Sequence, residues 1–204
     1  MGEYIENFED CLPDPKKVKE IKKELESKGV KYIYSNWIDF LGSPKTKPMP
    51  ISDFEDLCSG KGPQFAVHSV SFVPELTPAD NDQIPVPDLD SLLICPWDKT
   101  CAWVFSDLWW NGKPYDVCPR QTLKKQIFKN SQSDLKFYVG IEPEFFVMKW
   151  EDGKPVKAID NDPIPLRRQA FGYDSEYSID GMNFLKEVID ILNEELKWNL
   201  HDVV

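Results

Sequence analysis

Histidine is scarce in this chain of 204 residues, which contains only His68 and His201. A nucleophile activated by a histidine base is therefore a poor explanation of any activity. Long apolar runs are also missing, because no stretch approaches the roughly 20 residues that a membrane-spanning helix requires. The first ten residues are acidic and lack the basic and apolar regions of a signal peptide. We therefore expect a cytoplasmic protein.

Positive charge is in deficit, with 24 lysine and arginine residues against 35 aspartate and glutamate residues, so the formal net charge is −11. Such a surface repels polyanions, which argues against a nucleic-acid partner or an anionic membrane and fits a protein whose acidic groups hold cations. The five cysteines are scattered and form no C-x-x-C pair. This pattern favours buried thiols in a reducing compartment over disulfides or a zinc site.

The stretch from Tyr138 to Val147 places two carboxylates in an otherwise apolar run, Y-V-G-I-E-P-E-F-F-V. Its aromatic and β-branched residues favour a strand. Residues i and i+2 of a strand point to the same face, so Glu142 and Glu144 should project side by side, with Cα atoms roughly 6.5–7 Å apart. Pro143 between them has no N–H, which limits that position to an edge, a bulge or a strand end.

Three interpretations of the glutamate pair remain open on spacing alone. The first is a pair of solvated charges on an exposed edge strand. The second is a metal site, because magnesium prefers carboxylate oxygens and each glutamate could serve one ion of a two-metal site that clamps a phosphoryl group. The third is glycoside hydrolysis, in which paired carboxylates divide the acid and base roles.

The N-terminal half is predicted to be mainly β-structure with small helices. Asp14 as an N-cap, Pro15 at the first helical position and Gly29 after the last turn delimit one helix. A capping box, Ser52-x-x-Glu55, opens a second, short helix. Runs rich in β-branched and aromatic residues predict strands over 30–40, 64–73, 92–95 and 102–110.

Prolines crowd the region between the second and third of these strands. Pro74, Pro78, Pro85 and Pro87 predict a long irregular connection, because neither a helix nor a central strand tolerates them. A loop of that length is often functional. After the last strand, Asn111-Gly112 is the strongest hairpin signal of the chain.

A second unit is predicted to begin near Pro114. Its first helix starts at Pro119 and carries Leu123 and Ile127 on one face. The acidic strand follows and folds back at the turn signal Glu151-Asp152-Gly153. The last elements expected are a helix over 184–196 and a strand over 198–204. A strand that opens at the last residues would leave an unpaired edge, so we expect a truncated polypeptide.

The order of these pieces resembles the glutamine synthetase family, the ATP-dependent ligases that join glutamate to ammonia or another amine. The most specific match runs from Gly140 to Phe146, G-I-E-P-E-F-F, which is similar to the family's G-x-E-x-E-F segment. Supporting matches occur in the family's order, namely Asp39-x-x-Gly42-x-x-Lys45 with Pro50, Asp82 with Pro87-Asp88, Pro96-Trp97 and Pro119-Arg120-x-x-Leu123. The resemblance extends from about Val30 to Val204.

The resemblance implies an α+β fold with a division into three parts. Residues 1–14 would be a tail, and residues 15–113 a β-grasp N-terminal domain. Residues 114–204 would be the first part of a catalytic domain built from an antiparallel sheet and helices, and this part is incomplete. Family members assemble as stacked rings with active sites between subunits, which implies a homo-oligomer.

The resemblance also implies a mechanism. ATP would phosphorylate the γ-carboxylate of glutamate, and ammonia or another amine would displace phosphate from the γ-glutamyl phosphate. Two magnesium or manganese ions would hold the phosphates and the substrate, with Glu142 and Glu144 contributing one glutamate to each ion. No catalytic or nucleotide-binding residue is assigned within these 204 residues.

Two departures from the family pattern bear on function. Where the ammonia-using branch has F-D-G-S-S, this chain reads Phe65-Ala66-Val67-His68-Ser69, without the aspartate that helps to bind ammonium. The chain looks closer to the branch with γ-glutamylmethylamide synthetase and the type III enzymes. Family members also continue with further metal ligands and a nucleotide pocket, so the isolated chain is expected to be inactive. A noncatalytic binding or assembly module is the alternative hypothesis.

Overall fold

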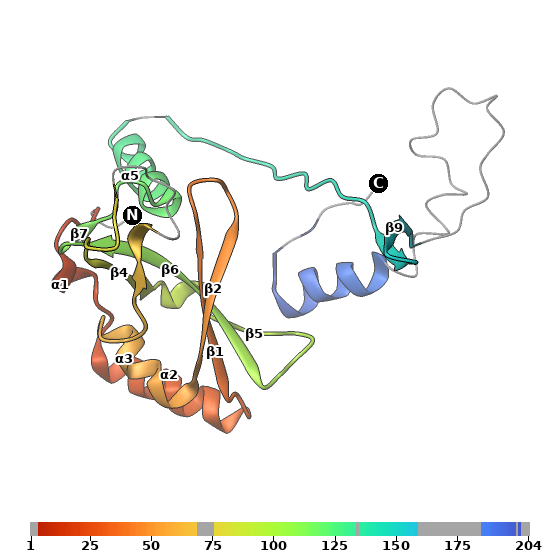
Figure 1. Cartoon of the computed structure of the whole chain (residues 1–204), viewed down its shortest axis with the longest axis horizontal. Coiled ribbons are helices and arrows are strands. Elements are labelled where there is room, and N and C mark those ends of the chain that lie inside the picture. The colour runs from red at the N-terminus through yellow and green to blue at the C-terminus, as the bar shows by residue number, and fades with distance from the viewer. Residues whose placement is uncertain (1–3, 69–75, 134, 159–184, 199, 201–204) are drawn as a thin grey trace. The chain divides into compact units, whose positions relative to one another are not determined.

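The computed structural model describes all residues except 1–3, 69–75, 134, 159–184, 199 and 201–204 (Figure 1). The chain forms two compact units, residues 1–136 and residues 137–204. Strands and helices occur in both units, which confirms an α+β fold. Among the described residues, no helix is long and apolar enough to cross a membrane.

A curled, mixed sheet organises the larger unit (Figure 1). Its strands are β1 (Tyr32–Ile38), β2 (Pro44–Pro50), β3 (Phe65–Ala66), β4 (Asp82–Pro87), β5 (Leu93–Ile94), β6 (Cys101–Trp110) and β7 (Lys113–Pro114). The main path runs β2-β1-β6-β4-β3, and β5 and β7 also pair with β6. The central pair, β1 and β6, is parallel, whereas the other pairs are antiparallel.

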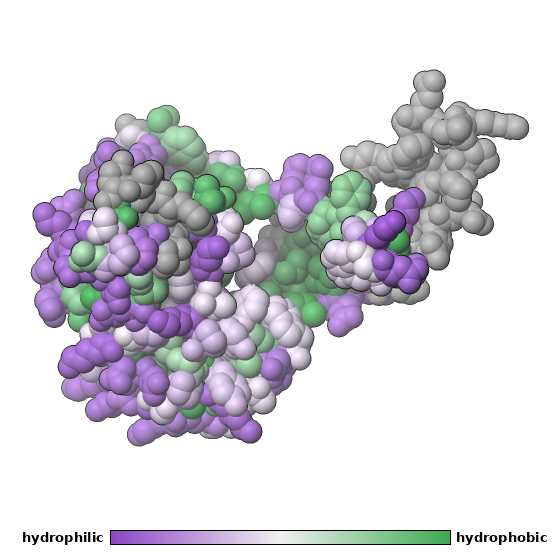
Figure 2. Space-filling model, viewed as in Figure 1, coloured by the Kyte–Doolittle hydropathy of each residue, from purple (hydrophilic) through white to green (hydrophobic). Residues whose placement is uncertain are grey.

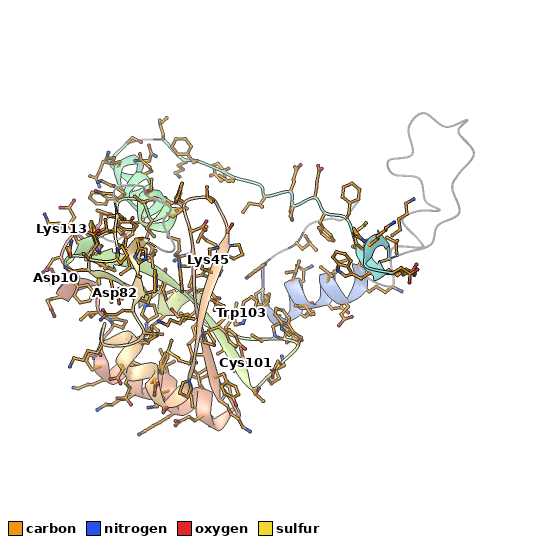
Figure 3. The ribbon with its side chains drawn as sticks, viewed as in Figure 1. Asp10, Lys45, Asp82, Cys101, Trp103 and Lys113 are labelled. Atoms are coloured by element: carbon orange, nitrogen blue, oxygen red, sulfur yellow. The ribbon has the colours of Figure 1, made fainter. Side chains whose placement is uncertain are left out.

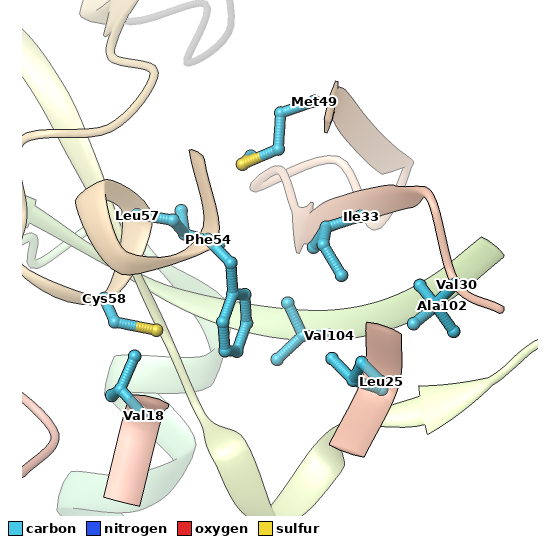
Figure 4. Packing of buried hydrophobic residues seen from close by; sticks show 10 residues of the cluster. All are labelled: Val18, Leu25, Val30, Ile33, Met49, Phe54, Leu57, Cys58, Ala102 and Val104. Atoms are coloured by element: carbon cyan, nitrogen blue, oxygen red, sulfur yellow. The ribbon is translucent and has the colours of Figure 1, made fainter. Parts of the chain in front are cut away.

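The main core lies between this sheet and two helices, α2 (Pro15–Ser27) and α3 (Phe54–Cys58) (Figure 1). Leu25 of α2, Phe54 and Leu57 of α3, and Ile33 of β1 are buried together, as Figure 4 shows. Burying each such side chain stabilises the fold by roughly 1.5–3 kcal/mol. The sheet and the two helices therefore depend on one another for their stability.

The limits of α2 are those that the sequence predicts. Asp14 Oδ1 accepts a hydrogen bond from Lys16 N at 2.9 Å, and Pro15 occupies the first turn. Gly29 follows the C-cap with φ of +86°, a conformation that glycine adopts at low cost. The outward surface of α2 is hydrophilic (Figure 2). The helix is thus amphipathic, with local signals at both ends.

The strand β4 overturns the prediction of an irregular connection across the proline-rich region. Residues Asp82–Pro87 form a strand between β6 and β3 although they include Pro85 and Pro87. β3 pairs only with Asp82 and Gln83. From Ile84 onward, that edge of β4 has no strand partner among the described residues. A missing N–H there removes no ladder hydrogen bond, so the prolines are tolerated.

The sequence pattern does not predict strand β2, because three of its seven residues, P-K-T-K-P-M-P, are prolines. It pairs with β1 on one side and ends the path of the sheet. Edge strands accept proline on the side that faces solvent. The position of the strand in the sheet, rather than its residues, therefore explains why it forms.

Two short elements differ in detail from their predictions. The predicted strand over 64–73 is confirmed only at β3, since Val67 and His68 are helical and residues 69–73 lie outside the described residues. The short helix is present as α3, preceded by the 3-10 turn η1 (Ile51–Asp53). The prediction that a capping box opens it is wrong. Glu55 pairs with Lys22 at 3.1 Å instead of reaching back to the backbone.

The acidic N-terminal segment contains a helical turn, α1 (Phe8–Cys11), that the sequence pattern does not reveal. The Phe8 ring meets Trp109 edge to face, with centroids 5.6 Å apart. It also lies so close to Gly60 that a Cβ atom there would come within 2.6 Å of it. A four-residue helix has no periodicity to recognise, and tertiary contacts hold it in place.

Both predicted tight turns are confirmed. Asn111 and Gly112 join β6 to β7 with φ of 51° and 75°. Asp152 and Gly153, with φ of 50° and 73°, join β8 (Met148–Glu151) to β9 (Lys154–Lys157) in the smaller unit. Positive φ at both central residues is the signature of the type I′ turn, which asparagine or aspartate followed by glycine favours.

The two remaining helices begin near their predicted positions. The first differs from its prediction in the side that is buried, and the second in its helical geometry. α5 (Pro119–Ser131) starts after Cys118, and a short 3-10 turn, η2 (Leu89–Ser91), precedes β5. Leu123 and Ile127 of α5 are 60% and 49% exposed, whereas Gln121 is buried. Residues 185–190 are helical and continue into a π-helix, η3 (Ile191–Glu195). Phe184 lies outside the described residues.

The predicted terminal strand falls mostly on residues that the structure does not describe. Trp198 and Leu200 are described and belong to no strand, and residues 199 and 201–204 lie outside the described residues. The predicted domain boundaries, 1–14, 15–113 and 114–204, stay predictions.

Candidate functional site

The glutamate pair lies in an irregular segment of the smaller unit. Glu142 and Glu144 are both exposed, and no strand forms over 138–147. The flanking Tyr138 and Phe146 are 90% and 93% exposed. The predicted strand is therefore wrong. Strand propensity reflects packing on a sheet, and no neighbouring strand pairs with this segment within the described residues.

Regular pairing starts directly after the glutamates. Ala158 N donates to Val147 O at 3.1 Å, and the β8–β9 hairpin continues from there. Within the part of the chain that the structure describes, no three histidine, cysteine, aspartate or glutamate residues gather as a metal site. Glu142 and Glu144 offer two carboxylates, whose oxygen donors suit magnesium or manganese. Their metal-binding role stays a prediction.

A cluster of four charged side chains forms in the larger unit, where motif positions far apart in sequence meet. Arg120 of α5 donates from Nη2 to Asp88 Oδ2 at 2.7 Å and from Nε to Asp107 Oδ1 at 3.0 Å. Lys124, one turn further along, donates from Nζ to Asp88 at 3.0 Å and to Asp107 at 2.5 Å. Each carboxylate thus binds both cations, and α5 is tied to β6 and to the end of β4.

The ionisation of this cluster follows from its pairing. Burial alone would raise the pKa of Asp88, but the hydrogen bond and charge of Lys124, with the charge of Arg120, hold that pKa below its ordinary value. Burial alone would lower the pKa of Lys124, yet Asp107 and Asp88 raise it. Asp88 and Lys124 therefore both carry charge at neutral pH. The cluster is suited to holding elements together and unsuited to exchanging protons.

A pocket of about 470 Å³ opens beside the charged cluster. Asp88, Asp107 and Lys124 form part of its wall, and Ile5 and Cys11 of the N-terminal segment form another part. Residues from five separate stretches of the chain line it. Sequence reasoning missed this pocket because no single stretch carries a signal for it.

The Asp39-x-x-Gly42-x-x-Lys45 motif builds the turn between β1 and β2. Asp39 is buried, and its Oδ1 accepts hydrogen bonds from Leu41 N at 3.0 Å and Ser43 N at 2.8 Å. Lys45, labelled in Figure 3, lies 3.4 Å from Asp39 Oδ2. Gly42 has φ of +82°. The motif therefore has a structural role in this chain.

The segment that departs from the family pattern begins with β3 and is described as far as His68. Phe65 stacks on Trp37 with ring centroids 4.1 Å apart and an interplanar angle of 7°. Val67 is buried in the same core cluster as Trp37. His68 is half-buried.

The matches to known proteins decide the family. The family model described as glutamine synthetase, catalytic domain, matches residues 116–202. A glutamine synthetase from Rhizobium meliloti is 31% identical over 171 residues, which cover 84% of this chain and 37% of the relative. This chain belongs to the glutamine synthetase family. The matched span of the model includes both Glu142 and Glu144.

Other members of the glutamine synthetase family show the same partial overlap. A glutamate–methylamine ligase from Methyloversatilis universalis is 31% identical over 147 residues, which cover 71% of this chain and 33% of the ligase. A solved structure of apo GmaS without ligand superposes with a TM-score of 0.68 at 21% identity, covering 89% of this chain and 41% of that one. A GmaS/ADP complex gives a TM-score of 0.57 at 20% identity. The chain spans between 33% and 41% of the length of these relatives.

Proposed function

We propose that this chain is the N-terminal portion of an ATP-dependent ligase that joins the γ-carboxylate of glutamate to ammonia or another amine. The observation that carries the proposal is the family match over 116–202, which includes the G-I-E-P-E-F-F segment. The mixed sheet around parallel β1 and β6 supports a β-grasp domain over 15–113. Residues 114–204 would open the catalytic domain, and the cytoplasmic location stays a prediction.

Glu142 and Glu144 would hold the divalent ions, magnesium or manganese, through their carboxylate oxygens. When bound, such ions offset charge on phosphate oxygens during phosphoryl transfer. The exposure of both glutamates and the absence of a lysine or arginine between them support this role. The ADP complex of GmaS supports the expectation that ATP is the nucleotide used. Assembly as a ring-shaped homo-oligomer is part of the same proposal.

The amine is the least constrained part of the proposal. Relatives of similar identity include a glutamine synthetase and a glutamate–methylamine ligase. Ala66 stands where the ammonia-using branch carries an ammonium-binding aspartate, which favours an amine other than ammonia. Phosphate release by the full-length protein, with ATP, glutamate and either ammonia, methylamine or a longer amine, is the test. Absence of release with every amine would overturn the proposal.

A noncatalytic binding or assembly module is the second candidate. It is favoured by the lack of a third metal ligand near Glu142 and Glu144 among the described residues. For the same reason we expect no ligase turnover from the chain of 204 residues alone. Coding DNA that continues in frame past Val204 with further acidic and arginine motifs would support the ligase, and a stop codon there would support the module.

Divalent binding by the isolated chain tests the metal role separately. Two carboxylates form a sparse ligand set, so we expect a Kd in the millimolar range, on the order of 1 mM or weaker. Calorimetry with Mn²⁺ should show this binding lost in the Glu142→Gln, Glu144→Gln double variant. The matched control, Glu187→Gln with Glu194→Gln, removes two exposed carboxylates from the same unit and should bind like the unaltered chain. Mn²⁺ binding that survives in the Glu142→Gln, Glu144→Gln variant would place the site elsewhere.

A further inference from the structure

Two buried cysteines face each other across the β5–β6 pair. The register places Leu93 opposite Trp103 and Ile94 opposite Ala102, so the next residues in line are Cys95 and Cys101. Cys95 N donates to Cys101 O at 2.9 Å, which extends the pairing by one step. Both side chains are buried, with 1% and 6% exposure.

The geometry of this pair suits a covalent link. Residues directly opposite in an antiparallel pair carry their side chains on the same face, with Cβ atoms about 4.5–5.5 Å apart. In a hydrogen-bonded pair the Cα atoms are about 5.5 Å apart. Cys95 and Cys101 make one of the two hydrogen bonds of such a pair, since Cys101 N donates to Asp98 O at 3.0 Å. Disulfides are found at Cα separations of roughly 4.4–6.8 Å. Closing the bond therefore requires side-chain rotation and a small approach of the two Cβ atoms.

We propose that Cys95 and Cys101 are an oxidative modification site that forms an intramolecular disulfide and closes the loop 96–100. The proposal is independent of the ligase function. The remaining cysteines lie elsewhere. Cys58 belongs to the main core, Cys118 to the core cluster that contains Trp37 and Val67, and Cys11 to α1. The cross-strand register is what distinguishes the pair.

A peroxide is the simplest oxidant for this step. The thiolate of one cysteine attacks the peroxide oxygen, breaks the O–O bond and becomes a sulfenic acid, releasing one water after proton transfer. The thiol of the other cysteine then displaces the hydroxyl as a second water and forms the S–S bond. The pair loses two electrons and two protons, and hydrogen peroxide is reduced to two waters.

The surroundings of the pair make the reaction slow at neutral pH. Burial, with the nearby Cys101 and Asp98, raises the pKa of Cys95 to about 11, although a backbone hydrogen bond and the charge of Lys99 act to lower it. Tyr34 of β1 packs beside both cysteines, and Cys101 Sγ donates to Asp98 Oδ2 at 3.2 Å. The thiolate is the reactive form, so the oxidation rate should rise as pH increases toward that pKa.

The loop that the disulfide would close carries an exposed aromatic residue. Trp97 is 65% exposed and meets Trp103 edge to face with ring centroids 5.2 Å apart. Cys101 and Trp103 lie near one another at the β5 end of β6 (Figure 3). The link would therefore restrict a loop that presents tryptophan on the surface.

The experiment oxidises the intact chain with hydrogen peroxide at mildly alkaline pH, blocks free thiols in denaturant and maps the tryptic peptides. Cleavage after Lys99 puts Cys95 and Cys101 on separate peptides that stay joined only through a disulfide. Free thiols should fall from five to three, since 5 − 2 = 3. Five remaining thiols in the intact chain, or only intermolecular links, would overturn the proposal.

Variants assign the link to these two residues. Cys118 shares a tryptic peptide with Cys101, so Cys118→Ser is the matched control and should still lose two thiols and keep the joined peptides. Cys95→Ser and Cys101→Ser should each keep all four remaining thiols. A joined peptide in Cys101→Ser would show that Cys118 is the partner and would overturn the assignment. The result for the unaltered chain does not depend on whether the variants fold.

Discussion

Arg120 forms two charge-assisted hydrogen bonds that close the contact between α5 and the sheet. In Arg120→Met, the Asp107 side chain, which is only 13% exposed, keeps Lys124 as its cation partner. We expect the unfolding free energy of the larger unit to fall by about 2 kcal/mol, because charged hydrogen bonds are lost at a mostly buried carboxylate. Urea denaturation followed by tryptophan fluorescence measures it.

The control for Arg120 is Lys129→Met, which removes an exposed cation from the last turn of the same helix. Its effect should stay within about 0.5 kcal/mol, as is usual for surface substitutions. Equal effects of the two variants would show that the charged cluster contributes nothing particular to stability.

The lowered pKa of Asp88 predicts an acid dependence of stability. A carboxyl whose pKa is lower in the folded state than in the unfolded state stabilises the fold above its unfolded pKa of about 3.9. That contribution is lost as pH falls through the folded value. The unfolding free energy should therefore decrease as pH is lowered below about 4.5, and less steeply in Asp88→Asn. Parallel pH curves for the two proteins would contradict this prediction.

The β6–β7 turn depends on the conformation of Gly112 rather than on space around it. A Cβ atom at Gly112 would meet nothing within 4 Å, but φ there is +75°. Gly112→Ala should therefore cost about 1 kcal/mol through backbone strain alone. Gly140 is equally open and has no positive φ, so Gly140→Ala should leave stability unchanged. Thermal unfolding of the two variants tests this, and equal Tm values would contradict the role of backbone strain at Gly112.

In α5, the polar side of the helix faces the sheet, and the apolar side is exposed. Its apolar positions Leu123 and Ile127 are exposed, whereas Arg120, Gln121 and Lys124 face the sheet. Gln121 Nε2 donates to Leu108 O at 3.4 Å from a buried position. Polar partners on β6 therefore determine which side of the helix packs, and helical periodicity alone points to the other side.

The division of the chain into two compact units predicts where a protease acts. Residues 138–147 belong to no strand among the described residues, and Tyr138 and Phe146 are almost fully exposed. Exposed backbone of this kind is cut readily. Limited chymotrypsin digestion should yield a stable fragment that ends between 137 and 146, while the bond after buried Trp109 persists. Digestion in denaturant, where both regions are open, is the control, and equal cleavage rates in the folded chain would contradict the prediction.

Features that depend on neighbours within a few residues follow from the local sequence. The predicted limits of α2, at Asp14-Pro15 and Gly29, are confirmed, and so are the turns at Asn111-Gly112 and Asp152-Gly153. Helix caps and type I′ turns depend on local backbone conformation. The family can also be recognised from the sequence, because its motifs occur in a fixed order and at a similar spacing.

The three-dimensional fold determines which prolines lie in strands and which apolar runs are paired. β4 accepts Pro85 and Pro87 because one of its edges has no strand partner there among the described residues. Residues 138–147 form no strand, and no described strand pairs with them. Asp88 and Arg120 were both visible as motif residues, yet their 2.7 Å contact across 32 positions is a property of the fold. Pairing and packing depend on residues distant in sequence, and the pattern along one segment does not contain them.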